Sequence, residues 1–197
     1  MSNFVHLHLH TSYSLLDSSI RHEPLIKRAA EFGMPAVAMT DHGNMFGAVE
    51  FYNTAKKHGI KPILGCEVYV APENRHEKKS KDNLRDASYH LILLSKNETG
   101  YKNLLRLITK GYLEGFYYKP RIDKELLAEH SEGLIALSSC IRGEVAHNVN
   151  RENVPRATKV AAQYAEIMGL DNFYLELQNH GLENQNRINK EIVGIGK

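Results

Sequence analysis

The residues best suited to chemistry lie near the start of the chain, in HLHLHTSYSLLD from His6 to Asp17. In a β-strand, successive side chains point to opposite faces, so His6, His8 and His10 would share one face. A buried polar ring without a partner costs roughly 1–3 kcal/mol, and histidine is the commonest metal ligand. A row of hydrogen-bonded histidines on an exposed face is the alternative. The interleaved leucines favour a half-buried strand that carries metal ligands.

Further candidate ligands fall at the ends of later segments that read as strands. Glu67 is the most informative of them, because a carboxylate within an apolar run is rare without a cation. His42 and Cys140 are weaker signals alone, since each residue type also packs in protein cores. Active-site residues of α/β folds gather beyond the carboxyl ends of the strands. We therefore expect one shared site from five segments, with candidates Asp41, His42, Glu67, His90 and Cys140 joining the first segment.

The ligand mixture indicates which ions and which reaction to expect. Imidazole, carboxylate and thiolate suit zinc, and imidazole with carboxylate also suits manganese or iron. The candidates outnumber the four ligands of one tetrahedral zinc, which predicts a cluster of two or three divalent ions. Such clusters stabilise the attacking and leaving oxygens of phosphoester cleavage and activate a water molecule. The expected nucleophile is therefore metal-bound water and no single protein side chain.

The elements that must position these residues alternate along the chain. Strands are predicted at residues 4–10, 36–40, 62–70, 90–95, 134–138 and 173–177. Helices are predicted at 24–32, 45–58, 101–112 and 154–168, with a last helix from about 183 onward. Strands that alternate with helices predict an α/β fold with a parallel sheet. We expect one domain, as either a barrel or an open doubly wound sheet.

Composition narrows the class of protein. The 197 residues suffice for one substantial core, and 42% of them are apolar. No apolar run has the length of a membrane span, and the first residues lack the pattern of a signal peptide. We therefore expect a cytoplasmic protein with no membrane partner. Two cysteines cannot form a disulfide framework, and a net charge of +2 does not by itself indicate nucleic acid.

Several segments together resemble a known family. HLHLHTSYSLLD, TDHGN, GCEVYV, YHLILL and ALSSC are similar to the motifs of the polymerase and histidinol phosphatase (PHP) domain. AVEFYNTAKKHGIKPILGCEVYV, TGYKNLLRLI, EGFYYKPRID and LELQNHG resemble the PHP domain of bacterial DNA polymerase III alpha subunits. The resemblance extends over essentially the whole chain.

The resemblance implies a distorted seven-stranded (β/α)7 barrel with up to three metal ions. Zn²⁺ or Mn²⁺ is expected, with Fe and Mg²⁺ as the other candidates. The implied ligands are His8, His10, Asp17, His42, Glu67, His90 and Cys140. The implied activity is a metal-dependent 3′–5′ exonuclease that proofreads during DNA replication. The implied partners are the 3′ end of a DNA primer strand, the other domains of the same polymerase chain and a proofreading subunit.

Two other functions stay open at this point. One is a scaffold without catalysis that stabilises the polymerase or docks a proofreading subunit. The other is a small-molecule phosphatase similar to histidinol phosphatase. The family's last motif, Asp-x-His on a seventh strand, does not occur after residue 180. We therefore expect residues 1–197 to be a partial PHP domain with about six of the seven strands and none of the polymerase domains.

Five further residues receive lesser roles. His6 and Asp41 are predicted to orient neighbouring metal ligands without binding metal themselves. Lys119, Arg121 and His180 are predicted contacts to a DNA phosphate, with an ordinary solvated loop as the alternative for each.

Overall fold

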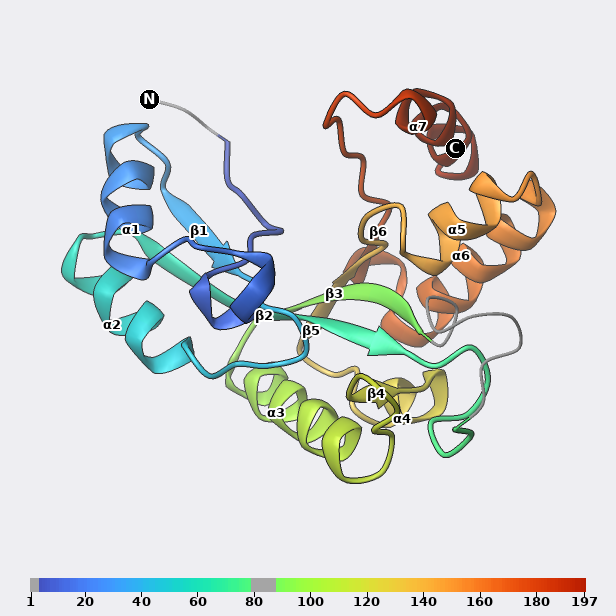
Figure 1. The fold of residues 1–197 in the computed structure, drawn as a ribbon, viewed down its shortest axis with the longest axis horizontal. Coiled ribbons are helices and arrows are strands. Elements are labelled where there is room, and N and C mark those ends of the chain that lie inside the picture. Colours follow the sequence, from blue (N-terminus) through green and yellow to red (C-terminus); the bar gives the residue numbers. More distant parts are fainter. Residues whose placement is uncertain (1–3, 79–87) are drawn as a thin grey trace.

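The computed structural model describes residues 4–78 and 88–197 of the protein. Its centre is a mixed six-stranded sheet in the order β1-β2-β3-β5-β6, with the short β4 paired to β2. Figure 1 shows the helices arranged around the outside of this sheet. The strands are β1 (Ala36–Met39), β2 (Lys61–Val70), β3 (Tyr89–Ser95), β4 (Arg121–Ile122), β5 (Leu134–Leu137) and β6 (Phe173–Tyr174). The predicted α/β class is confirmed.

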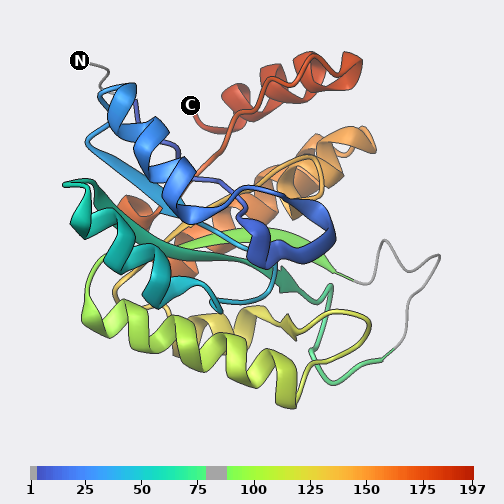
Figure 2. The ribbon, with the colours of Figure 1, turned by 60° about the vertical axis from the view of Figure 1, so that its left-hand side comes forward.

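The helices bury apolar faces against the sheet and against one another. The N-terminal pair is α1 (His22–Glu31) and α2 (Ala48–Lys57), which pack together and reach β1 and β2. Helix α3 (Glu98–Leu113) covers β3 and β4, and α4 (Lys124–Glu129) lies against α6. Figure 2 shows α5 (Glu144–Asn150), α6 (Val154–Met168) and α7 (Glu183–Ile195) grouped on the other side. Two 3-10 turns, η1 (Ser12–Asp17) and η3 (Leu170–Asn172), complete the elements.

The core explains why the sheet holds its place. Fully buried aliphatic side chains of β1, β2 and β3 meet Phe51 of α2 and Leu104 and Leu107 of α3 in one continuous cluster. Burying a side chain of this size contributes about 1.5–3 kcal/mol. Among the described residues, no helix is both long and apolar enough to cross a membrane.

The sheet is not parallel throughout, which corrects the sequence-based expectation. β3 runs antiparallel to both of its neighbours, β2 and β5. A parallel pair needs a crossover connection, usually a helix, and residues 71–78 and 88, the described part of the connection from β2 to β3, contain none. The reversal places the first residues of β3 beside the last residues of β2, with His90 opposite Tyr69.

The predicted first strand is also corrected. Residues 4–10 are extended beside β1, where Ala38 N donates to His6 O at 2.9 Å and Thr40 N donates to Leu9 O at 2.8 Å, but they form no regular strand. An apolar groove of about 1060 Å³ lies between this segment and β6, with Phe4, Leu7, Tyr174 and Leu177 in its wall. Closure of the sheet into a seven-stranded barrel therefore stays a prediction.

Candidate metal centre

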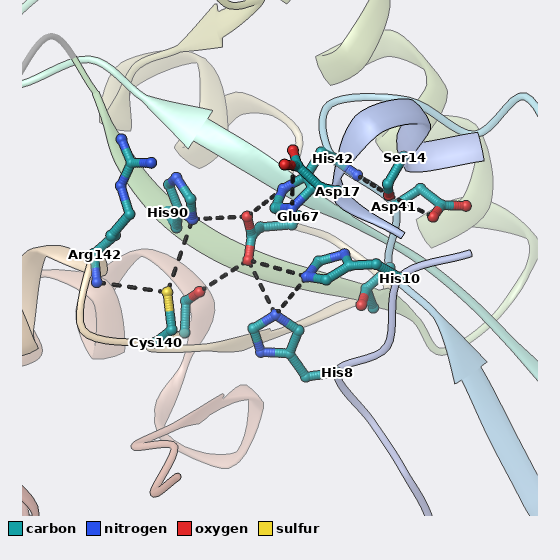
Figure 3. A network of polar contacts seen from close by, with 12 residues as sticks. His8, His10, Ser14, Asp17, Asp41, His42, Glu67, His90, Cys140 and Arg142 are labelled. Carbon is teal, nitrogen blue, oxygen red and sulfur yellow. Dashed lines mark hydrogen bonds and ion pairs between the residues drawn. The ribbon is translucent and has the colours of Figure 1, made fainter. Parts of the chain in front are cut away.

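One buried carboxylate, that of Glu67, is the centre of the site. Its side chain is 2% exposed, and imidazoles surround it (Figure 3). His42 Nδ1 and His90 Nδ1 lie 2.6 and 2.7 Å from Oε1. His8 Nε2 lies 3.0 Å from Oε2, and His10 Nε2 lies 3.9 Å from the same atom. Four histidines from separate parts of the fold thus converge on one carboxylate.

The extended N-terminal segment delivers His8 and His10 because it is fastened to the end of β1. Thr40 Oγ1 accepts a hydrogen bond from Leu9 N at 2.8 Å. The carboxylate of Asp41 accepts from Thr11 N at 2.6 Å, from Thr11 Oγ1 at 2.7 Å and from Ser14 Oγ at 2.6 Å. These bonds fix the two histidines in place without a regular strand ladder.

The other ligands arrive from the strands. His42 follows β1 and bridges to Glu67 of β2, where Glu67 N donates to Asp41 O at 3.0 Å and Gly43 N donates to Glu67 O at 2.9 Å. His90 reaches the same place from the start of β3 because that strand is antiparallel. Antiparallel pairing therefore explains why a residue at the beginning of a strand joins residues at strand ends.

Asp17 and Cys140 lie at the edge of this group. Asp17 Oδ2 is 3.8 Å from His42 Nε2, and its side chain is 59% exposed. Cys140 Sγ is 3.8 Å from His90 Nδ1 and accepts from Arg142 N at 3.5 Å. All seven predicted ligands line one pocket of about 420 Å³: His8, His10, Asp17, His42, Glu67, His90 and Cys140.

Two sets of donor atoms are compact enough to hold an ion. They are His8, His10 and Glu67, and His42, Glu67 and His90, each with its donor atoms within 4.8 Å of one another. Glu67 belongs to both sets. A carboxylate with two oxygens can bridge two ions, so the arrangement suits a centre of more than one metal.

The electrostatics of the pocket favour charge on Glu67 and on His8. Burial by itself would raise the pKa of Glu67, but the close approach of His42, His8 and His90 outweighs it and lowers the pKa below its usual range. Burial by itself would lower the pKa of His8, but Glu176 and Glu67 raise it to about 9. For His10, burial and the neighbouring His42 lower the pKa. The carboxylate thus stays ionised and attracts protons or cations.

The pocket fits a metal on the evidence of its own polar atoms. His10 Nδ1 and His90 Nε2 are buried without a hydrogen-bond partner. Glu67 Oε1 has two imidazole nitrogens, His42 Nδ1 and His90 Nδ1, within 2.7 Å. His8 Nε2 and His10 Nε2 face each other at 3.2 Å. Buried polar atoms in folded proteins are nearly always satisfied. A divalent cation bound among these converging nitrogen and oxygen atoms would supply the missing partner.

The structure places the lesser candidates differently from the sequence-based expectation. His6 is exposed, lies edge-on to Phe4 and faces the apolar groove, so it orients no ligand in this arrangement. Among the described residues, the carboxylate of Asp41 bonds only to the Thr11 and Ser14 groups named above, so it positions the segment rather than an imidazole. The alternation of an ideal strand fails for His6 because the segment is irregular.

The three predicted phosphate contacts separate into two kinds. Arg121 is 1% exposed, and its guanidinium donates to the carbonyls of Gly115, Arg75 and Glu77. It therefore has a structural role, which corrects the prediction. Lys119 and His180 line the metal pocket, and His180 Nδ1 lies 3.4 Å from Gln185 Nε2.

Sequence reasoning missed Glu176 and Gln178. Glu176 Oε1 lies 2.7 Å from His8 Nδ1, and Gln178 Nε2 donates to Glu176 Oε1 at 2.6 Å. Ser138 Oγ accepts from Glu176 N at 2.8 Å and holds that backbone in place. A carboxylate on the outer nitrogen of a histidine fixes the ring so that the other nitrogen faces the metal. The signal was present, because Glu176 lies between two leucines as Glu67 lies in an apolar run.

Comparison with known proteins finds relatives that are similar over nearly the whole chain. The chain is 48% identical over 193 residues to DNA polymerase III subunit alpha of Treponema pallidum, covering 98% of this chain and 16% of that protein. It is 49% identical over 192 residues to the subunit of Borreliella burgdorferi, covering 98% and 17%. The chain thus spans about a sixth of the length of these relatives.

A solved structure from Bifidobacterium adolescentis, provisionally described as a metal-dependent phosphoesterase, has a TM-score of 0.47 at 12% identity, covering 98% of this chain and 84% of that one. That degree of likeness is too low to bear on function. The family model of the PHP domain matches residues 6–180, which include every residue of the pocket described above. This protein therefore belongs to the PHP domain family, and its sequence relatives are alpha subunits of DNA polymerase III.

Proposed function

We propose that this chain is a metal-dependent phosphoesterase module of a replicative polymerase and removes nucleotides from the 3′ end of DNA. The observation that carries the proposal is the buried Glu67 with four imidazoles within 3.9 Å of its carboxylate oxygens. A structural core has no need of that arrangement, because burying charge and unpaired nitrogens costs stability.

The residues of the pocket would have the following roles. Glu67 bridges the two donor sets, and His8, His10, His42 and His90 complete them. Asp17 and Cys140 add a carboxylate and a thiol at the open side of the pocket. Zinc or manganese held there would polarise the phosphoester and lower the pKa of a water molecule. Burial raises the pKa of the Cys140 thiol, so that group ionises with difficulty in the absence of a cation.

The biological setting rests on the relatives. Their printed name is DNA polymerase III subunit alpha, and a phosphoesterase attached to a polymerase is placed to correct replication errors. We accordingly propose a partial PHP domain over residues 1–197, a DNA primer end as substrate, and other domains of the same polymerase chain and a proofreading subunit as partners. We place the protein in the cytoplasm.

The test compares metal content and nucleotide release. Elemental analysis of the purified chain is expected to find stoichiometric zinc, manganese or iron. With added Mn²⁺, the chain is expected to shorten a 5′-labelled single-stranded oligonucleotide from its 3′ end. His8→Ala and Glu67→Ala should lower both metal content and the cleavage rate, the latter by about 100-fold or more, since even outer hydrogen-bond partners of metal ligands contribute 10–100-fold.

Glu166→Ala is the matched control, because Glu166 is an exposed carboxylate of α6 outside the pocket. Equal cleavage by the parent and by Glu67→Ala would reject the proposal. A chain that purifies without metal, and whose interactions with polymerase domains survive both ligand substitutions, would favour the scaffold. Hydrolysis of a phosphomonoester with no effect on DNA would favour the small-molecule phosphatase.

A further inference from the structure

Two cations lie in the wall of the metal pocket, and the metal centre does not use them. They are Lys119, in the loop before β4, and Arg142, in the turn after Cys140. Within residues 4–78 and 88–197, neither side chain has a carboxylate within ion-pair distance. The two carboxylates of the pocket lining, Glu67 and Asp17, lie against imidazoles, so the two cationic side chains have no carboxylate partner among the described residues.

Lys119 is held against Tyr69, two residues beyond Glu67 on β2. Its Nζ lies 5.3 Å from the centre of the Tyr69 ring, within the range of a cation–π contact. The loop that carries it is tight, because Tyr117 N donates to Lys119 O at 3.0 Å and Tyr118 adopts a left-handed φ of 58°. At Gly43 a Cβ atom would lie 2.9 Å from the ring of Pro120, so the loop packs closely on the end of β1. The loop therefore places the ammonium group beside Tyr69 in the lining of the pocket.

Arg142 lines the same pocket. Its backbone is fixed by His90, whose N donates to Arg142 O at 3.1 Å, and Figure 3 shows its side chain running alongside His90. Arg142 and Lys119 thus both line the pocket that contains the candidate metal ligands.

We propose that Lys119 and Arg142 bind phosphate oxygens of a polynucleotide substrate that the metal ions do not contact. This inference rests on the proposed function, since the metal centre defines where the cleaved phosphate lies. Arginine offers a planar fork that matches two phosphate oxygens, and lysine offers a point charge that tolerates several orientations. The pairing suits a strand with several phosphates better than a compact phosphomonoester with a single one.

The experiment measures binding apart from cleavage. The Mn²⁺-loaded chain is titrated against a fluorescein-labelled pentathymidylate, whose 3′ linkages are phosphorothioates to slow hydrolysis, at several salt concentrations. Lys119→Met and Arg142→Met are each expected to weaken binding about tenfold, the effect of one charge-assisted hydrogen bond. Each should also reduce the slope of log K against log salt by about 0.7, the value for one phosphate contact on a single strand. Metal content should equal that of the parent.

Lys159→Met and Arg156→Met are the matched controls, because both residues are exposed on α6 and outside the pocket. Binding and salt slopes of the pocket variants equal to those of the controls would overturn the proposal. Loss of metal from either pocket variant would also overturn it, since the side chain would then support the metal centre. A parent that binds the oligonucleotide with the expected slopes but releases no nucleotide would refute the exonuclease and leave the phosphate contacts supported.

Discussion

Two buried charged networks of this protein, the metal pocket and the cluster around Asp123, differ in how completely their polar atoms are paired. The Asp123 carboxylate accepts from Arg75 N, from the Arg75 guanidinium and from Leu126 N. Arg121 beside it donates to three carbonyls. In the metal pocket, His10 Nδ1 and His90 Nε2 are buried without a hydrogen-bond partner, and Glu67 Oε1 contacts only the imidazoles of other candidate ligands. Complete pairing marks a network that stabilises the fold, and incomplete pairing marks one that is prepared for a ligand.

The largest effect on stability should follow from Asp123→Ala. The substitution leaves the Arg75 guanidinium, whose side chain is 13% exposed, with the 31% exposed Glu114 as its remaining carboxylate partner, and it removes the side chain that caps α4. Breaking a buried ion pair costs about 3–5 kcal/mol, so the free energy of unfolding should fall by roughly 3 kcal/mol in urea titrations. Metal content per folded molecule should not change. A loss below about 1 kcal/mol would contradict the role assigned to this network.

Glu176→Gln should have the opposite pattern of effects, with a loss of metal affinity and little change in the stability of the metal-free chain. It removes the negative charge of the carboxylate that contacts His8 Nδ1 and keeps the shape of the side chain at position 176. Metal affinity, measured by competition with a chelator, should fall about 10–100-fold. The midpoint of urea unfolding of the metal-free chain should stay close to that of the parent at about pH 10, above the pKa of about 9 at which His8 loses its charge. Glu166→Gln on exposed α6 is the control. Unchanged metal affinity would show that Glu176 does not position His8.

The smallest predicted difference between the two networks is in how their contributions to the free energy of unfolding depend on pH. Burial alone would raise the pKa of Asp123, but hydrogen bonds from Arg75 and Leu126 lower it. Its stabilising contribution is therefore present above its ordinary pKa and is lost as pH falls through the lowered value. The pKa of His8 is raised to about 9, so in the metal-free chain its contribution is complete below about pH 6.5 and is lost as pH rises through 9.

Urea unfolding of the chelator-treated chain between about pH 3 and pH 10 can test both signs. The difference in the free energy of unfolding between the parent and Asp123→Asn should decrease as pH falls. The difference in the free energy of unfolding between the parent and His8→Gln should decrease as pH rises. Two differences that decrease in the same direction of pH would show that one of the assigned interactions is wrong.

Residue type and strand periodicity predicted much of the candidate site. His8, His10 and Glu67 could be selected because polar groups recur among apolar neighbours at positions that a sheet would bury. The direction of β3 could not be predicted, since it depends on the connection between β2 and β3 and not on the composition of either strand. His90 was therefore selected without the reason for its position, which is that antiparallel pairing brings it opposite Tyr69.

Residues of loops and of very short elements were the hardest to place. Lys119 in the loop before β4 and Arg121 in β4 are two positions apart, yet Lys119 lines the pocket and the side chain of Arg121 is buried in the fold. Only the packing of Pro120 and Gly115 distinguishes them, and neither contact has a local sequence signal. Helices α4 and α5 were missed as well, because six- and seven-residue helices show too few turns for a periodic pattern.

The contact between His8 and Glu176 joins positions that are 168 residues apart in the chain. During synthesis, the pocket therefore cannot assemble until Glu176 has left the ribosome, long after the N-terminal histidines have done so. Closing so long a loop has an entropic cost, and a bound cation would offset it by binding only the folded form. Chelation should consequently loosen the N-terminal segment and the chain after β6 together, as amide hydrogen exchange would report.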